Sequence, residues 1–200
     1  LKYLVFLCKK SKSELKGTNA LKYIEWGEKQ KNEEGILWCK LPTVSGRNYW
    51  YNLKIENVAD SIIIMIFNDV FRTFYNSQKI LTNNKLYDVN FKEKIVKEKQ
   101  IICLNNSLFW MMIELFGRSN LAEGARDLAR YEVSNLIILH PKYIQKTYFD
   151  NKIENREISS IFKELGIDSS KPIREQEPKP LSDRAELDKI IFDELGLTKE

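Results

Sequence analysis

Apolar residues three and four positions apart predict three helices in the second half of the chain. This spacing places apolar side chains on one face of a helix, and it occurs over residues 104–116, 158–165 and 187–195. A glycine directly follows each of these segments, which is a common way for a helix to end. The three glycines are Gly117, Gly166 and Gly196. The last two segments are predicted to be amphipathic helices of a C-terminal tail.

The stretch between these two tail helices has a different composition. Residues 169–180 contain three prolines and five charged residues, which is typical of a stiff and mostly extended linker. After it, Asp183 and Glu186 have the spacing of a capping box, which would start the last helix.

Shorter apolar runs predict strands. Residues 62–67 are six apolar residues in a row, as expected for a strand that is buried on both faces. Residues 79–82 and 85–89 flank Asn83 and Asn84. Because asparagine tolerates the positive φ that tight turns require, this segment predicts a hairpin.

Further strands are expected in two other places. Glycines separate short apolar runs in the first 60 residues, among them residues 36–39, and this pattern is typical of β structure with long polar connections. Residues 125–129 and 136–139 resemble short strands joined by a turn at residues 131–135.

Together these elements predict an α+β fold in two parts. Residues 1–150 form a β-rich domain with a supporting helix near 104–116, and residues 151–200 form a helical tail. The first residue is Leu1 and the first methionine is Met65, so the chain is interpreted as an internal piece of a longer protein.

Composition then narrows the class of protein. The chain has 200 residues, of which 43% are hydrophobic, 12% aromatic and 30% charged, as in an ordinary globular protein. Its longest apolar run is far shorter than the roughly 20 residues of a membrane span, so no membrane partner is expected. Three cysteines without a Cys-x-x-Cys pair favour the reducing cytoplasm. With a single histidine, His140, a metal site is not expected either.

Positive charge is concentrated in the front of the chain. Residues 1–150 carry 23 Lys and Arg against 16 Asp and Glu, a net charge of +7, whereas residues 151–200 carry −3. An excess of Lys and Arg is what a polyanion-binding surface needs, because it neutralises phosphates. The alternative, which charge alone leaves open, is the lysine-rich surface of a protein from an AT-rich genome.

The sequence lacks the common motifs of catalysis and cofactor binding. It contains no Gly-x-Gly, no phosphate-binding loop and no pair of adjacent prolines, so it has no Asn-Pro-Pro-Tyr loop of the kind that holds a flipped adenine. No catalytic residue is therefore assigned.

Polar and aromatic residues instead gather in clusters that suit DNA contact. Arginine and lysine bind phosphates or guanine edges, asparagine pairs with adenine edges, and aromatic rings stack on bases. The candidates for DNA binding are Arg47, Trp50, Tyr51, Arg72, Asn76, Lys79, Asn83, Asn84, Lys85 and Arg118. Taken one at a time, the aromatic residues also suit a core and the arginines a solvated surface.

In order along the chain, several short motifs resemble one family. They are Ala-Leu-Lys-Tyr-Ile-Glu-Trp-Gly-Glu at 20–28, Arg-Asn-Tyr-Trp-Tyr at 47–51, Leu-Asn-Asn-Ser-Leu at 104–108, Glu-Leu-Phe-Gly-Arg at 114–118, Leu-Ala-Glu-Gly-Ala at 121–125, and the segment 184–198. The sequence resembles the C-terminal specificity part of TaqI-like N6-adenine DNA methyltransferases of type II restriction-modification systems.

The resemblance implies a DNA target recognition domain, with a solenoid-like or barrel-like β-rich part. It implies double-stranded DNA and an upstream methyltransferase domain of the same polypeptide as partners. S-adenosylmethionine is expected in that upstream domain, so this chain carries no cofactor and is non-catalytic.

The alternative function is a protein–protein assembly module within a restriction-modification enzyme. For DNA reading, Arg47, Arg72 and Arg118 are expected to share one exposed basic cleft. A protein interface would instead present an apolar patch with charges at its rim.

Overall fold

Contacts along the chain divide it into two units, Leu1–Asn57 and Val58–Glu200. The residues that the computed structural model describes are 5–53, 58–119, 124–145 and 152–197. The expected boundary near residue 150 is replaced by one after residue 57. The reason is that the tail helices do not stand apart, since Leu187 and Ile191 of the last helix lie in the core of the second unit.

The first unit, residues 1–57, contains a helix where strands were expected. Helix α1 spans Asn19–Gly27, and the Thr18 hydroxyl caps it by accepting from the backbone N–H of Leu21 at 3.2 Å. The strand predicted at residues 36–39 is wrong, because the chain there makes a 3-10 turn, Trp38–Lys40, followed by another at Pro42–Val44. Leu15, Ile24 and Tyr51 form the small buried core of this unit.

The second unit, residues 58–200, is built around a three-stranded antiparallel sheet in the order β3-β1-β4. Strand β1 (Ser61–Ile64) is central and pairs with β3 (Thr73–Tyr75) and β4 (Leu86–Val89). The apolar run predicted as one strand continues past Met65 into β2 (Ile66–Phe67), which pairs with β5 (Arg126–Asp127) in a second sheet. The β-branched Ile62 and Ile63 are buried in the central strand, whereas Ile64 is half-buried and Ile66 is exposed, so the run is not covered on both faces throughout.

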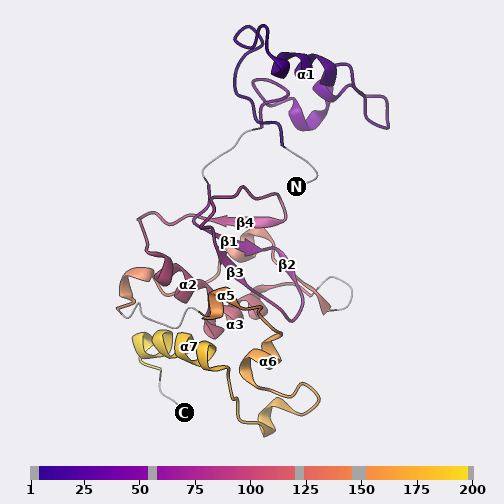
Figure 1. Ribbon diagram of the computed structural model, residues 1–200. Coiled ribbons are helices and arrows are strands. Elements are labelled where there is room, and N and C mark those ends of the chain that lie inside the picture. Colours follow the sequence, from indigo (N-terminus) through magenta and orange to yellow (C-terminus); the bar gives the residue numbers. More distant parts are fainter. Residues whose placement is uncertain (1–4, 54–57, 120–123, 146–151, 198–200) are drawn as a thin grey trace. The chain divides into compact units, whose positions relative to one another are not determined.

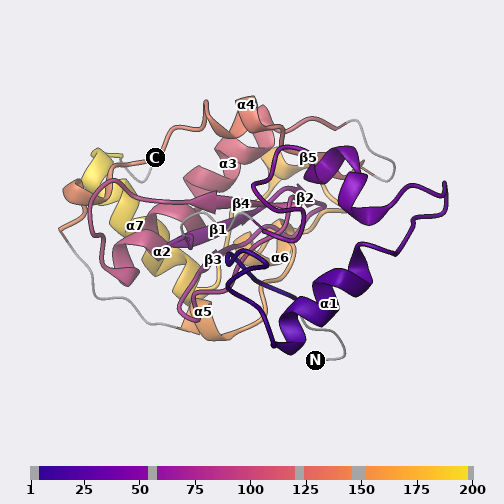
Figure 2. The same cartoon turned by 90° about the horizontal axis from the view of Figure 1, so that it is seen from above.

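Helices pack against this sheet and complete the core, as Figures 1 and 2 show. Helix α2 contacts both β3 and α7, and α3 and α5 also contact α7. The helices of this unit are α2 (Lys97–Asn105), α3 (Ser107–Phe116), α4 (Arg130–Val133), α5 (Lys152–Asn155), α6 (Ile161–Leu165) and α7 (Ser182–Leu195). Two 3-10 turns, Pro141–Tyr143 and Ile173–Glu175, complete the set of described elements. The α+β class is confirmed.

The predicted hairpin is only half right, because β4 forms but residues 79–82 are not a strand. Asn76 explains the difference. Its buried side chain donates to Ile80 O at 2.9 Å and accepts from Ile80 N–H at 2.9 Å, so the backbone groups that a strand would use for pairing are already occupied. Lys79 adopts the left-handed region with φ 52°, which also breaks extended structure.

Residues 131–139 also differ from the prediction. The turn expected at 131–135 is mostly helix α4, and no strand forms at 136–139. The Glu132 carboxylate accepts from the backbone N–H of Ala129 at 2.6 Å, so this side chain closes the first turn of α4.

The tail helices end as predicted, at Gly166 and Gly196, each in the left-handed conformation with φ 65°. The segment between them, however, does not extend away from the protein. Lys179 N–H donates to Leu165 O at 2.9 Å, so the chain folds back onto α6. A side chain at position 166 would collide with the Lys179 carbonyl. Glycine is therefore required here for two reasons, the close approach of Lys179 and the positive φ.

The predicted capping box at the start of α7 is wrong. Leu181 is the N-cap residue, and no side chain caps the helix. Asp183 is instead buried, where it binds Arg156.

Asn106 separates α2 from α3 within the segment predicted as one helix over 104–116. Its buried side chain donates to Ile102 O at 2.8 Å and Cys103 O at 2.9 Å, closing the end of α2. Its oxygen accepts from Phe109 N–H at 2.8 Å, capping α3. The Asn106 side chain therefore provides hydrogen-bond partners for backbone groups at the end of α2 and at the start of α3.

We expect Asn106→Ala to lower the free energy of unfolding of the second unit by about 2–4 kcal/mol, because the change removes a helix cap and leaves buried backbone groups without partners. Urea denaturation followed by circular dichroism at 222 nm measures this. Asn84→Ala, at an exposed turn position, is the control and is expected to change stability by less than about 0.5 kcal/mol. Equal effects of the two substitutions would contradict the role given to Asn106.

Candidate nucleic-acid interface

An aromatic cavity of about 330 Å³ lies within the first unit. Three of the four tryptophans of the chain line it. The lining residues are Phe6, Tyr23, Ile24, Trp26, Gly27, Trp38, Leu41, Val44, Arg47, Trp50, Tyr51 and Leu53. Arg47 is the one residue among them whose side chain carries a charge.

Four of these rings form a continuous series of contacts. The ring centroids of Phe6 and Tyr23 are 5.0 Å apart, and those of Tyr23 and Trp26 are 5.4 Å apart with planes inclined by 25°. Trp26 in turn meets the ring of Trp38 edge to face at 5.6 Å. Tyr23 is 50% exposed and Trp26 is 47% exposed, so the middle of this series faces solvent.

Helix α1 positions these two rings. Ile24 and Gly27 face the interior of the unit, whereas Tyr23 and Trp26, three residues apart, are neighbours on the outer part of the same helix. Gly27 is required by the close approach of Trp50, since a Cβ at this position would lie 2.6 Å from the Trp50 ring. The helix can therefore lie directly on the indole that closes the cavity.

Hydrogen bonds hold Trp50 and Tyr51 in the wall of the cavity. The Trp50 indole N–H donates to Glu28 at 3.2 Å, and Glu28 binds Lys12 at 2.5 Å. The buried Tyr51 hydroxyl donates to the Lys10 carbonyl at 2.9 Å, and burial raises the pKa of Tyr51. Trp50 and Tyr51, predicted to contact DNA, thus both line the cavity, and hydrogen bonds hold each of them in place.

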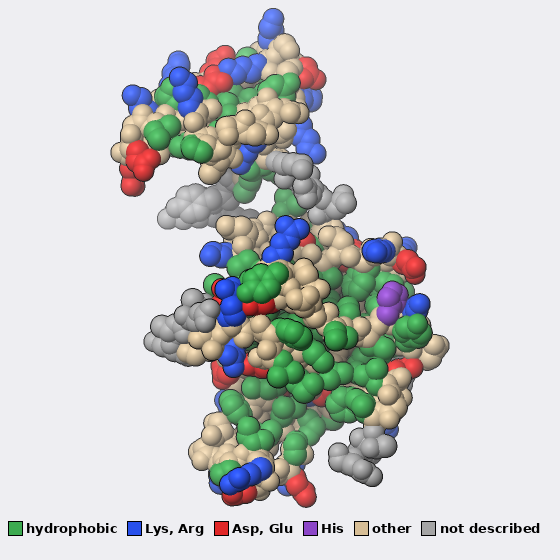
Figure 3. Space-filling model, turned by 180° about the vertical axis from the view of Figure 1, so that it is seen from behind, with side chains coloured by type: hydrophobic (Ala, Val, Ile, Leu, Met, Phe, Trp, Pro, Cys, Tyr) green, Lys and Arg blue, Asp and Glu red, His purple; other side chains and the backbone are tan. Residues whose placement is uncertain are grey.

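The first unit also carries the positive charge of the protein. Its 57 residues include eleven Lys and Arg against six Asp and Glu, a net charge of +5, whereas the second unit has a net charge of −1. Several Lys and Arg side chains project from the first unit in Figure 3. Of the net charge of +7 on residues 1–150, residues 1–57 therefore supply +5 and residues 58–150 supply +2.

The predicted arginines of the second unit both have partners within the protein. Arg72 donates to the carbonyls of Glu154 at 2.6 Å and Arg156 at 3.1 Å, and burial lowers its pKa. Arg118 forms ion pairs with Asp127 at 3.4 Å and Glu132 at 2.9 Å. Both arginines hold segments of the second unit together, and Arg47 lies in the other unit.

The remaining candidates lie on the loop between β3 and β4. Asn76 is buried, and its side chain makes hydrogen bonds to the backbone of Ala59 and Ile80. Lys79 is exposed and lies 3.9 Å from Asp60. Asn83, Asn84 and Lys85 share one exposed turn, in which the Asn83 side chain accepts from Lys85 N–H at 2.9 Å. The sequence clusters are thus brought together at two places: Arg47, Trp50 and Tyr51 at the cavity, and Asn83 to Lys85 at this turn.

Sequence reasoning missed the role of Tyr23 and Trp26 as exposed rings. Both lie in the segment 20–28, which carries part of the family resemblance. In a helix, residues three positions apart lie on the same face. The spacing of Tyr23 and Trp26, next to Gly27, could therefore have identified an aromatic helix face.

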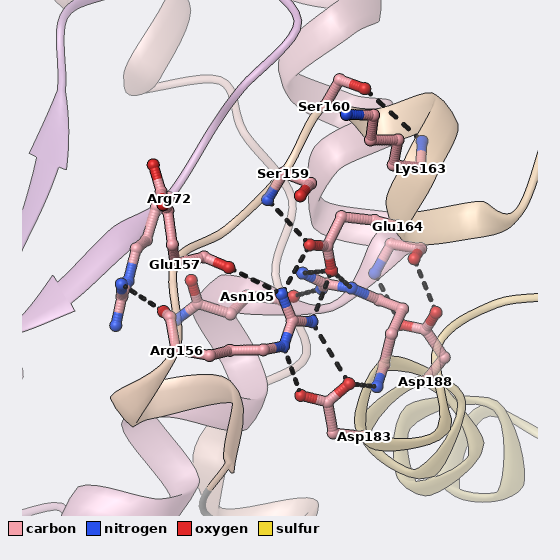
Figure 4. A network of polar contacts seen from close by, with 12 residues as sticks. Arg72, Asn105, Arg156, Glu157, Ser159, Ser160, Lys163, Glu164, Asp183 and Asp188 are labelled. Carbon is pink, nitrogen blue, oxygen red and sulfur yellow. Dashed lines mark hydrogen bonds and ion pairs between the residues drawn. The ribbon is translucent and has the colours of Figure 1, made fainter.

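A second set of residues that the sequence did not reveal is a buried charged network (Figure 4). Arg156 binds Glu164 through two nitrogens, at 2.6 and 2.7 Å, and binds Asp183 at 2.7 Å. Arg184, which is completely buried, lies 3.4 Å from Glu164 and also donates to the carbonyl of Asn105. These contacts join α2, α6 and α7.

The network has a structural role rather than a chemical one. The carboxylates at its centre, Glu164 and Asp183, are bound by arginines, and Asp188 accepts from the N–H and the hydroxyl of Ser107 at 2.6 Å each, at the first residue of α3. Among the residues that the structure describes, no three or more His, Cys, Asp or Glu side chains are grouped to hold a metal ion. In the same described part of the chain, no helix has the length and apolarity to cross a membrane.

Glu164 gives the network a pH dependence. Burial alone would raise its pKa, but hydrogen bonds from Arg156 and Ser159 N–H, with the charge of Arg184, hold the pKa below its ordinary value of 4.5. A carboxyl whose pKa is lowered by folding stabilises the protein above its unfolded pKa and loses this contribution as pH falls through its folded pKa. Asp188 acts in the opposite sense, because burial raises its pKa.

We expect Glu164→Gln to reduce stability at neutral pH by about 3–5 kcal/mol, because it leaves buried arginine charges without their partner. The loss of stability below about pH 4.5 should then be shallower than in the unchanged protein. Urea denaturation at several pH values measures both effects. Glu175→Gln, at an exposed position of the same tail, is the matched control and should leave the pH profile unchanged. If the stability of Glu164→Gln fell with pH as steeply as that of the unchanged protein, the Glu164 carboxylate would not contribute to the pH dependence of stability.

Comparison with known proteins identifies the family. The family model described as "Type II methyltransferase M.Eco57I, C-terminal domain" matches residues 2–168. No curated protein and no solved structure gives a significant match. The match spans most of the chain and includes the aromatic cavity, the sheet and helices α2 and α3. The chain therefore belongs to the family of type II methyltransferase C-terminal domains.

Proposed function

We propose that this chain is the target recognition domain of a site-specific DNA N6-adenine methyltransferase of a restriction-modification system. The observation that carries this proposal is the concentration of positive charge and exposed aromatic rings in one unit of a type II methyltransferase C-terminal domain. Double-stranded DNA is its proposed partner. The upstream catalytic domain of the same polypeptide is the second.

The charge distribution supports a role in DNA binding. Lysine and arginine contacts to phosphates supply the sequence-independent part of DNA affinity and steer the protein onto the duplex. In the first unit Lys9, Lys10 and Lys16 are exposed, and the unit as a whole carries +5. The second unit, with a net charge of −1, would contribute the exposed turn of Asn83 to Lys85 rather than a broad basic surface.

Catalysis is assigned to another domain. Methylation of adenine needs a cofactor site and a polar-Pro-Pro-aromatic loop, and this sequence has neither motif. In this proposal S-adenosylmethionine binds upstream, and the chain supplies position and sequence discrimination in the cytoplasm, where restriction-modification enzymes meet DNA.

A specific observation favours the alternative, an assembly module. Helix α3 is apolar almost all round, and its outer side leaves Leu115 69% exposed and Met111 47% exposed. Hydrophobic side chains gather over the second unit in Figure 3. A helix that is apolar on every side is normally covered, so this surface suits contact with another protein domain. The two functions are compatible if the first unit binds DNA and the second binds a protein.

The charge argument predicts how lysine substitutions change DNA binding. Replacing Lys9, Lys10 and Lys16 with glutamine should weaken binding to a mixed-sequence duplex and make the slope of log affinity against log salt shallower by about 2–3, because each lost phosphate contact removes about 0.9. Fluorescence anisotropy titrations at several salt concentrations measure this slope.

The matched control removes the same charge from the second unit. Lys92→Gln, Lys163→Gln and Lys189→Gln together change exposed positions there and should leave the slope nearly unchanged. An equal effect of both triple variants would mean that only net charge matters. If the unchanged protein bound no duplex even at low salt, DNA reading would be rejected in favour of the assembly role.

The assignment of catalysis to another domain is tested directly. The chain is expected not to bind S-adenosylmethionine in calorimetry and not to transfer tritiated methyl groups to mixed-sequence DNA. Measurable cofactor binding, or incorporation above a blank without protein, would mean that part of the catalytic site lies within these 200 residues.

A further inference from the structure

We propose that the aromatic cavity of the first unit binds a nucleobase that is out of the DNA stack, with Tyr23 and Trp26 as its stacking surface. This inference rests on the proposed function and deepens it, because it names the part of the DNA that this site takes. It concerns a base that is unpaired or displaced, rather than the edge of a paired base in a groove.

The first argument is the exposure of the rings. The largest apolar side chains of a small unit are expected in its core, yet among the described residues of this unit the buried core consists of Leu15, Ile24 and Tyr51 and includes no tryptophan. Tyr23 and Trp26 remain about half exposed, although they stack on each other at 5.4 Å. The unit thus keeps two aromatic rings partly open to solvent at the edge of a cavity, and exposed aromatic rings bind single-stranded nucleic acids by stacking on the bases.

The second argument is size. At about 330 Å³ the cavity is at the lower end of small-molecule sites, so it accommodates a single planar group and not a strand, a helix or a base pair. A base within an intact duplex is covered on both faces by its neighbours. Only a base that has left the stack can therefore present its faces to the rings of this cavity.

The third argument is charge. Lys22 is exposed one helical turn before Trp26, and Lys29 is exposed three residues after it. Cations beside an aromatic surface match a nucleotide, whose base is flat and largely apolar on its faces and whose phosphate is anionic. An aromatic side chain of a partner protein would fill the same volume but would not need these lysines.

Arg47 adds a group that can recognise the bound base. It lines the cavity, and among the described residues its guanidinium makes one hydrogen bond, to Trp50 O at 3.4 Å. Guanidinium has five N–H donors, so donors remain for an acceptor on the base edge or on its phosphate. By contrast, Arg72 and Arg118 of the second unit are occupied by partners in the protein.

The test uses the whole chain and two single-stranded probes of equal length and charge. One is a short thymidine oligonucleotide, and the other is the same backbone with abasic sites, so that only the bases differ. Anisotropy titrations are expected to show that the thymidine oligonucleotide binds about 5- to 150-fold more tightly, which is the contribution of stacking one base. Tryptophan fluorescence should be quenched by the first probe alone.

Substitutions at Trp26 separate stacking from simple apolar contact. Trp26→Ala should abolish the difference between the two probes, Trp26→Phe should keep most of it, and Trp26→Leu should lose most of it despite its apolar side chain. Tyr143→Ala, which removes a similarly exposed ring (54%) from the second unit, is the matched control and should keep the difference. Circular dichroism shows whether each variant is folded. If Trp26→Ala does not fold, the comparison of Trp26→Phe with Trp26→Leu still tests the inference.

The outcomes distinguish this inference from the proposed function. If the chain binds duplex DNA with the expected salt slope but binds thymidine and abasic probes equally, the base site is refuted and DNA reading stands. If Trp26→Leu binds as tightly as the unchanged protein, the cavity acts as an apolar contact and the inference fails. If no nucleic acid binds at all, the proposed function fails first and the inference with it.

Discussion

The second unit depends on the burial of one charged side chain, Arg184. Its guanidinium lies 4.2 Å from the centre of the Trp110 ring, 3.4 Å from Glu164, and within hydrogen-bonding distance of the Asn105 carbonyl. An isolated buried charge is very costly, so each of these partners must be in place when α7 docks. The partners come from the end of α2, from α3 and from α6, and this single residue therefore specifies how four helices meet.

The same constraint explains which parts of the fold could be predicted from sequence. Helical periodicity followed by glycine identified the segment of α3 and both tail helices, because those signals are local. The role of Asp183 is not local. Its spacing to Glu186 suggested a helix cap, but Arg156, 27 residues earlier, binds it in the interior. Charged pairs that form across the fold leave no spacing pattern in the sequence.

The strand predicted at residues 79–82 failed because a side chain competed with backbone pairing. Residues 79–82 flank the Asn83-Asn84 turn as a hairpin strand would, yet Asn76 occupies both backbone groups of Ile80. The candidate site shows the same limit. Arg47, Trp50 and Tyr51 were recognised as a cluster because they are adjacent in sequence, whereas Tyr23 and Trp26 join them only through the packing of Gly27 on Trp50. The boundary after residue 57 likewise depends on contacts and not on composition.

The small core of the first unit has a consequence for how its ligand and its folding are linked. In the described part of this 57-residue unit, the buried core consists of Leu15, Ile24 and Tyr51, and so small a core is near the lower limit for stability without help from metals, disulfides or partners. A ligand that binds only the folded form adds RT ln(1 + [L]/Kd), which is about 2.7 kcal/mol at one hundred times Kd. A molecule that occupied the aromatic cavity would therefore stabilise the folded unit, so that recognition of the ligand and the folding equilibrium of this unit would be linked.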